Sequence, residues 1–137
     1  MASKTVHLNW NPETKFSASN QNDVQIRISQ QNAIGASDLL PISLIGCSSH
    51  DVVEILQKQR QELHQLNVSA EATQDDDPPW KFRKIHITFQ AVGKNLDPEK
   101  VRKAILLSEE KYCSVYVTLK DVVEITHDVE VVEAVEA

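Results

Sequence analysis

The fold depends first on the apolar run Leu39-Leu40-Pro41-Ile42-Ser43-Leu44-Ile45-Gly46-Cys47, which is far longer than one strand of a small domain. The apolar character continues through 52–56 before the chain turns polar at Gln57. A helix that is apolar on almost every side is one that is buried on most sides. Asp38 is a suitable N-cap, and Pro41 would then fall in the first turn, where its missing N–H costs nothing. The sequence therefore predicts a long, buried central helix. Its own short strands give such a helix little cover, which favours a second subunit.

The segment before this helix has the period-2 pattern of half-buried strands. Its alternating apolar positions are Val6, Leu8 and Trp10, followed by Val24, Ile26 and Ile28. The turn-rich stretches 11–13 and 19–23 separate these runs. We expect two or three antiparallel strands here, with Arg27 on the solvated face opposite Ile26 and Ile28.

The segment after the helix predicts further strands and one more helix. Residues 66–73 and 82–89 alternate as strands, and the acidic stretch 75–79 between them is expected to be a solvated turn rather than a metal site. Asp97 followed by Pro98 marks the start of a helix that should end near Tyr112. A last strand covers 122–129, and the end of the chain is expected to fray. The whole chain, 1–137, is predicted to be one α+β domain with antiparallel sheets.

Length, composition and charge fit an ordinary globular protein of one domain. The chain has 137 residues, of which 41% are hydrophobic and 25% charged. A net charge of −6 offers no basic face for nucleic acid or an anionic membrane. No uninterrupted apolar run approaches the roughly 20 residues of a membrane span. The start of the chain has no apolar segment typical of a secretory signal, so we expect a cytoplasmic protein.

The chain has only two cysteines, Cys47 and Cys113. In the reducing cytosol they are not expected to form a structural disulfide. They are too few for a cysteine-only zinc site, and no paired histidine spacing completes one, so no metal is expected. Taken without further context, the simplest interpretation is that both are small buried side chains.

The sequence around each cysteine resembles the OsmC/Ohr family, in particular its less characterised OsmC-like branch. The resemblance rests on 35–40, 45–47 and 51–53 around the first cysteine, and on 96–101 and 108–115 around the second. It covers nearly the whole chain in the right order. The resemblance implies an OsmC-like fold and an intertwined two-fold homodimer with two sites at its interface.

The resemblance also implies thiol-dependent reduction of hydroperoxides, preferably organic ones, without metal or organic cofactor. Cys47 would be the peroxidatic thiolate that becomes a sulfenic acid. Cys113 would resolve it as a disulfide, which an external dithiol then reduces. The two cysteine Cα atoms must approach within about 6 Å for this. Cys47 must also react as a thiolate, which requires a cationic or donor-rich neighbour.

The residues that would activate Cys47 depart from the family pattern. The family uses an arginine held by a glutamate; here Lys15 and Asp38 stand at the corresponding places. Lysine does not reproduce the forked geometry of arginine. The nine residues from Asp38 to Cys47 correspond to a rise of about 13.5 Å on a straight helix, so direct contact is not expected.

A second candidate activator is His50, three residues after Cys47 on the same helix face, oriented by Asp51. The alternative is that His50 faces solvent or the dimer partner and Asp51 makes a local hydrogen bond. At the level of function, two alternatives to a peroxidase remain. One is a non-enzymatic ligand-binding or redox-sensing homodimer, and the other is a structural homodimer with inert cysteines.

Overall fold

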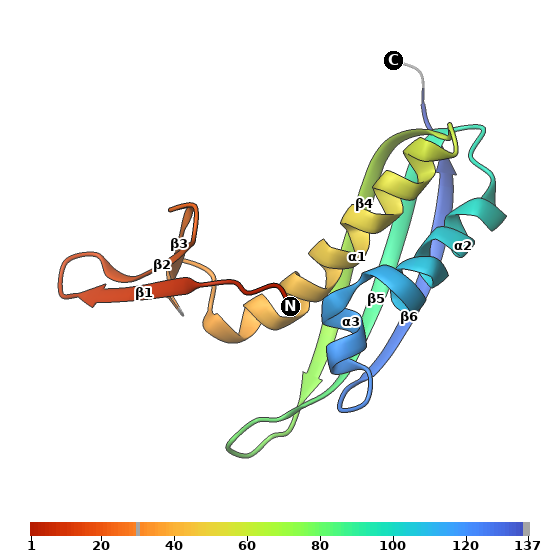
Figure 1. The fold of residues 1–137 in the computed structure, drawn as a ribbon. Coiled ribbons are helices and arrows are strands. Elements are labelled where there is room, and N and C mark those ends of the chain that lie inside the picture. Colours follow the sequence, from red (N-terminus) through yellow and green to blue (C-terminus); the bar gives the residue numbers. More distant parts are fainter. Residues whose placement is uncertain (30, 136–137) are drawn as a thin grey trace. The chain divides into compact units, whose positions relative to one another are not determined.

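The computed structural model describes residues 1–29 and 31–135, which divide into a unit of residues 1–40 and a unit that begins at Pro41. The first unit is a three-stranded antiparallel sheet in the order β1 (Val6–Asn11), β2 (Lys15–Asn20) and β3 (Gln25–Ile28) (Figure 1). At the first turn the Asn11 side chain accepts hydrogen bonds from the N–H groups of Glu13 and Thr14. The predicted antiparallel strands of this segment are confirmed.

One face of this sheet is apolar and exposed. The strand register sets Trp10 opposite Phe16, and Leu8 opposite Ala18, which in turn lies opposite Ile26. Trp10 alone leaves 55% of its surface exposed. The other face is polar and carries Arg27 beside Ser17, as expected from the alternation. A sheet face of this kind is the usual mark of an interaction surface.

The second unit contains nearly all of the long helix, α1 (Leu39–Lys58), which follows the short 3-10 turn η1 (Ala36–Asp38). The Asp38 carboxylate accepts a hydrogen bond of 3.0 Å from the Gly35 N–H, at the start of that turn. Within one chain, α1 buries a single stripe at i, i+4 spacing: Leu44, Ser48, Val52 and Leu56. Only one sheet covers the helix within the single chain, so burial on most sides, which was predicted with the cover of a second subunit, stays a prediction.

Helix α1 also meets a composition test for membrane spans. An 18-residue window within Ala36–Lys58 has a mean hydropathy of 1.4, and the helix is long enough to cross a bilayer. The core helix of a globular protein meets the same criterion, and the buried stripe of α1 packs in the core of its unit.

The second sheet has the order β4 (Glu62–Gln74), β5 (Phe82–Lys94) and β6 (Glu124–Glu133). Strands β4 and β5 form an antiparallel hairpin, whereas β5 and β6 are parallel. The prediction of purely antiparallel sheets is wrong at this pair. Its physical reason is the helical crossover between β5 and β6, which returns the chain to the same end of the sheet.

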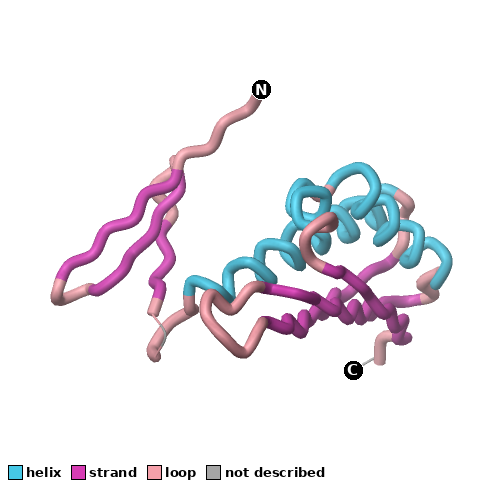
Figure 2. The backbone as a smooth tube through the Cα atoms, turned by 90° about the horizontal axis from the view of Figure 1, so that it is seen from below, coloured by secondary structure: helices cyan, strands magenta, loops and turns pink. Residues whose placement is uncertain are grey.

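The crossover consists of α2 (Pro98–Leu107), the π-helical turn η2 (Ser108–Tyr112) and α3 (Ser114–Leu119). Asp97 caps α2 by accepting a hydrogen bond of 2.9 Å from the Glu99 N–H, as predicted. The short helix α3 was not predicted. Helices α1, α2 and α3 lie on one face of the sheet β4-β5-β6, as Figures 1 and 2 show.

The space between helices and sheet is the core of the second unit. It is built mainly from Ile85, Ile87 and Phe89 of β5 and from the buried faces of α1 and α2. The opposite face of the sheet is polar, with a hydrogen bond of 3.0 Å between Asn67 and Gln90. Cys113 belongs to the apolar core, which brings the second cysteine beneath α1.

Candidate functional site

The structure brings Cys47 and Cys113 into contact. Cys47 lies half-buried on α1, and Cys113 lies directly before α3 with 2% of its surface exposed. Both are free thiols, and Cys47 packs against the core cluster that contains Cys113. They are 66 residues apart in the sequence (113 − 47) and meet because the crossover folds over α1. This contact is what a pair of cysteines must have if it is to form a disulfide.

Two donors point at the sulfur of Cys113. The Tyr116 N–H lies 3.3 Å from Sγ, and the Ser48 hydroxyl donates to the same atom over 3.7 Å. Burial raises the pKa of the Cys113 thiol, and the neighbouring Cys47 side chain raises that pKa further. The Tyr116 N–H and the Ser48 hydroxyl act in the opposite direction, because they favour the thiolate.

The π-helical turn η2 that precedes Cys113 makes side-chain contacts with both α1 and β6. Ser108 donates a hydrogen bond of 2.7 Å to the Asp51 carboxylate on α1. Glu109 forms an ion pair of 3.0 Å with His127 on β6. The hydrogen bond between these two side chains raises the pKa of His127. The backbone of η2 ends with the Cys113 N–H bonded to the Ser108 carbonyl at 2.8 Å. A π-helical turn is frequent at functional sites, and here it sets the position of the second cysteine.

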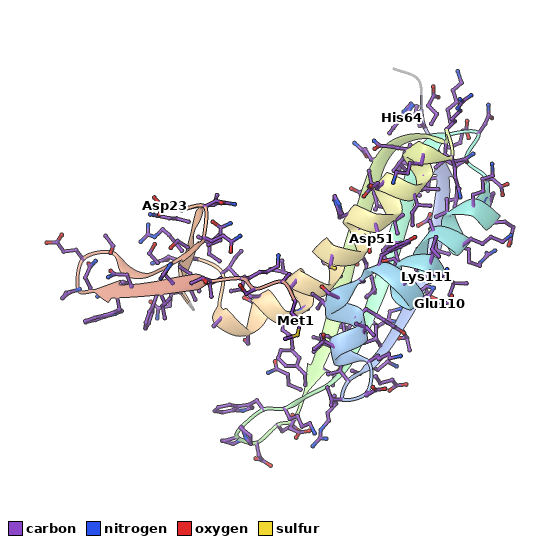
Figure 3. The ribbon with its side chains drawn as sticks, in the orientation of Figure 1. Met1, Asp23, Asp51, His64, Glu110 and Lys111 are labelled. Carbon is purple, nitrogen blue, oxygen red and sulfur yellow. The ribbon has the colours of Figure 1, made fainter. Side chains whose placement is uncertain are left out.

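His50 does not have the predicted partners. Its side chain is 77% exposed and lies 3.4 Å from Glu54, and Asp51 accepts instead from Ser108. Figure 3 shows Asp51 on α1 beside the segment that carries Glu110 and Lys111. The exposure of His50 agrees with the alternative interpretation, but the hydrogen bond of Asp51 is not local, because its partner Ser108 lies on η2.

The other two predicted activators, Lys15 and Asp38, belong to the first unit. Lys15 opens β2 in the left-handed backbone region, with φ 61°. Asp38 is engaged with the Gly35 N–H. Their roles toward Cys47 stay predictions.

Sequence reasoning missed four residues around the cysteines: Ser48, Ser108, Glu109 and His127. Ser48 had one visible signal, a hydroxyl at an apolar position of the helix stripe. The other three depend on the crossover geometry, for which the sequence has no local pattern.

Two hollows adjoin η2. One, of about 380 Å³, lies between α1 and the end of α2 and is lined by polar and apolar residues including Asp51, Ile55 and Leu107. The other, of about 280 Å³, is lined by the η2 residues, Cys113 and the start of α3. Tyr112 lines both and is largely exposed, so it does not close the core.

Comparison with known proteins identifies the family. The family described as OsmC-like protein matches residues 29–128. Protein YhfA of Escherichia coli K12 is 43% identical over 89 residues, which are 65% of this chain and 66%, just under two thirds, of that relative.

Comparison with solved structures identifies proteins that share this fold. A hypothetical protein from Aquifex aeolicus VF5 is 27% identical with a TM-score of 0.88, covering 98% of this chain and 100% of the other. The organic hydroperoxide resistance protein OhrB of Bacillus subtilis shares the fold, with a TM-score of 0.62 at 15% identity and coverage of 94% and 98%. The chain belongs to the OsmC-like protein family.

Proposed function

We propose that this protein is a thiol peroxidase that reduces hydroperoxides, preferably organic ones, in defence against oxidative stress. The observation that carries the proposal is that Cys47 and Cys113 lie close together, with Cys47 packed against the core that contains Cys113. Two thiols in contact can exchange two electrons with an oxidant and end as one disulfide. Neither the core nor the fold requires cysteine at both places, since an apolar side chain of similar size would pack as well.

The exposure of the two thiols supports the role that we propose for each. Cys47 is half-buried and Cys113 is almost fully buried, so an incoming hydroperoxide reaches Cys47 first. The Cys47 thiolate attacks the O–O bond, the alcohol leaves, and Cys47 becomes a sulfenic acid. Cys113 then attacks the Cys47 sulfur, water leaves, and the disulfide forms. An external dithiol returns both cysteines to thiols and is itself oxidised to a disulfide.

The homodimer is part of the same proposal. The exposed apolar face of β1, β2 and β3 supports it, because a lone chain leaves this face in water. The uncovered sides of α1 also support a homodimer, because an apolar helix with one buried stripe has further surface to bury. A second copy of the chain would cover both. We also propose that the dimer lies in the cytoplasm. Its net charge of −6 offers no basic face, so we propose no nucleic acid or anionic membrane as a partner.

A redox-sensing role on the same fold is the second candidate. It is favoured by the position of His50, which pairs with Glu54 and not with the thiol site. A sensor would form the same disulfide with an oxidant but would not be recycled at a useful rate.

The test is the intact mass of the reduced protein after brief exposure to one equivalent of cumene hydroperoxide. We expect rapid loss of two hydrogens, and no such loss in Cys47→Ser. Cys113→Ser should instead gain one oxygen, because its sulfenic acid cannot be resolved. An unchanged mass of the native protein over minutes would contradict the peroxidase. Disulfide formation without turnover, when dithiol and excess hydroperoxide are supplied, would favour the sensor.

A further inference from the structure

We propose that Ser48 is a catalytic residue of the thiol cycle. Its hydroxyl and the Tyr116 N–H together stabilise the Cys113 thiolate, so Cys113 is the leaving group when a dithiol reduces the Cys47–Cys113 disulfide. The inference deepens the proposed function and rests on its disulfide cycle. It assigns which sulfur the reductant attacks and which groups of the chain assist.

The position of Ser48 is unusual for a hydroxyl. It occupies the buried stripe of α1 between Leu44 and Val52, with 2% of its surface exposed. A hydroxyl moved from water into an apolar core is unfavourable unless it finds a hydrogen-bond partner. Here the partner is the Cys113 sulfur, 3.7 Å from the Ser48 oxygen. The hydroxyl therefore touches a reacting atom of the proposed cycle.

The second donor comes from a different element. The Tyr116 N–H in the first turn of α3 lies 3.3 Å from the same sulfur. Donors already aimed at an atom where negative charge develops stabilise that charge without rearrangement, and their effect is stronger away from water. Burial alone would disfavour a Cys113 thiolate, and these two groups offset part of that penalty.

The exposure of the two cysteine sulfurs determines which of them the reductant attacks. A dithiol in its thiolate form reaches the half-buried sulfur of Cys47 more readily than the buried sulfur of Cys113. Its sulfur bonds to Cys47, the S–S bond breaks, and the electron pair moves to Cys113, which leaves as a thiolate between the two donors. The second thiol of the reductant then attacks its own mixed disulfide, releases Cys47, and closes a cyclic disulfide. Cys113 takes up a proton from solvent.

The adjacent residue provides a matched control. Ser49 also has a buried hydroxyl oxygen on α1, but this oxygen has no hydrogen-bond partner in the described part of the chain. Ser48→Ala and Ser49→Ala therefore remove the same atom from neighbouring positions. Only the first removes a donor to the Cys113 sulfur.

The experiment starts from disulfide made with diamide, which does not depend on any reaction with hydroperoxide. We measure reduction by excess dithiothreitol at fixed pH in the native protein and both variants. Loss of one hydrogen bond to a forming thiolate should slow reduction about tenfold in Ser48→Ala. Ser49→Ala should stay within about twofold of the native rate. Ser48→Thr, which keeps the hydroxyl, should recover much of the loss.

A second measurement needs no substitution. The native disulfide is treated with glutathione, free thiols are blocked with N-ethylmaleimide, and peptides are mapped. Glutathione should be found on Cys47 and the maleimide on Cys113. Glutathione mainly on Cys113, reduction of Ser48→Ala at the native rate, or equal slowing in Ser49→Ala would each overturn the inference. If hydroperoxide leaves the native mass unchanged but Ser48→Ala still slows reduction, the peroxidase fails and the role of Ser48 stands.

Discussion

The ion pair between Glu109 and His127 should make the stability of this protein depend on pH. The two side chains are 13% and 20% exposed, and the His127 Nδ1 lies 3.0 Å from a Glu109 oxygen. The hydrogen bond with Glu109 is the main cause that raises the pKa of His127, with the charges of Glu109 and Asp128 adding to it and burial opposing it. The ring also packs edge-on against Phe89. Replacement of His127 by Gln keeps a polar amide at this place and removes the titrating charge.

Proton linkage determines whether the stability of the protein rises or falls with pH. The folded state raises the pKa of His127 above its ordinary value of 6.5, so the folded state binds the proton more tightly. The stabilisation is fully present below pH 6.5 and is lost as pH rises through the folded pKa. Exposed ion pairs contribute about 0–1 kcal/mol, and breaking a buried pair costs about 3–5 kcal/mol. For a half-buried pair we expect about 1–2 kcal/mol at low pH, or roughly 3–8 °C in the unfolding midpoint.

The assay is thermal unfolding, followed by circular dichroism at one protein concentration, for native protein and His127→Gln at pH 6 and pH 9. The difference between the two midpoints should be largest at pH 6 and should shrink at pH 9. His64→Gln is the control, because His64 lies 3.5 Å from Glu62 in an exposed pair. It should change the midpoint little at either pH. A His127→Gln deficit that is constant with pH, or that grows toward pH 9, would refute the reasoning.

Two further predictions concern assembly and packing. Leu8→Lys places a charge on the apolar face of the first sheet and should shift the protein from dimer to monomer in sedimentation velocity. The control Asn9→Lys places the same charge on the polar face and should leave the dimer intact. A dimer that survives Leu8→Lys would contradict the proposed interface. Gly93→Ala should strongly lower the free energy of unfolding measured by urea titration, because its Cβ would lie 2.2 Å from the Glu62 carbonyl oxygen. The Cβ of Gly46→Ala in α1 would meet nothing within 4 Å, so this variant should be neutral or stabilising by up to about 1 kcal/mol. Equal effects of the two glycine substitutions would show that the close approach at Gly93 is not rigid.

The pattern of the sequence determined most of the elements. Period-2 alternation located β1 and β3, and the Asp97-Pro98 pair located the start of α2. These signals are local, since a cap or an alternating run acts over a few residues. The family resemblance, drawn from motifs around both cysteines, is confirmed. The prediction of a single domain over 1–137 stays a prediction.

The tertiary structure decided the features that depend on how distant segments meet. It made β5 and β6 parallel, because the crossover helices return the chain to the same end of the sheet. It paired His50 with Glu54 and Asp51 with Ser108, which helix spacing alone did not distinguish from a Cys47 partner. It placed the hydroxyl of Ser48 and the N–H of Tyr116 around Cys113. Sequence spacing restricts contacts within one helix or strand, whereas the site around Cys113 forms between α1, η2 and α3, and only their packing brings these groups together.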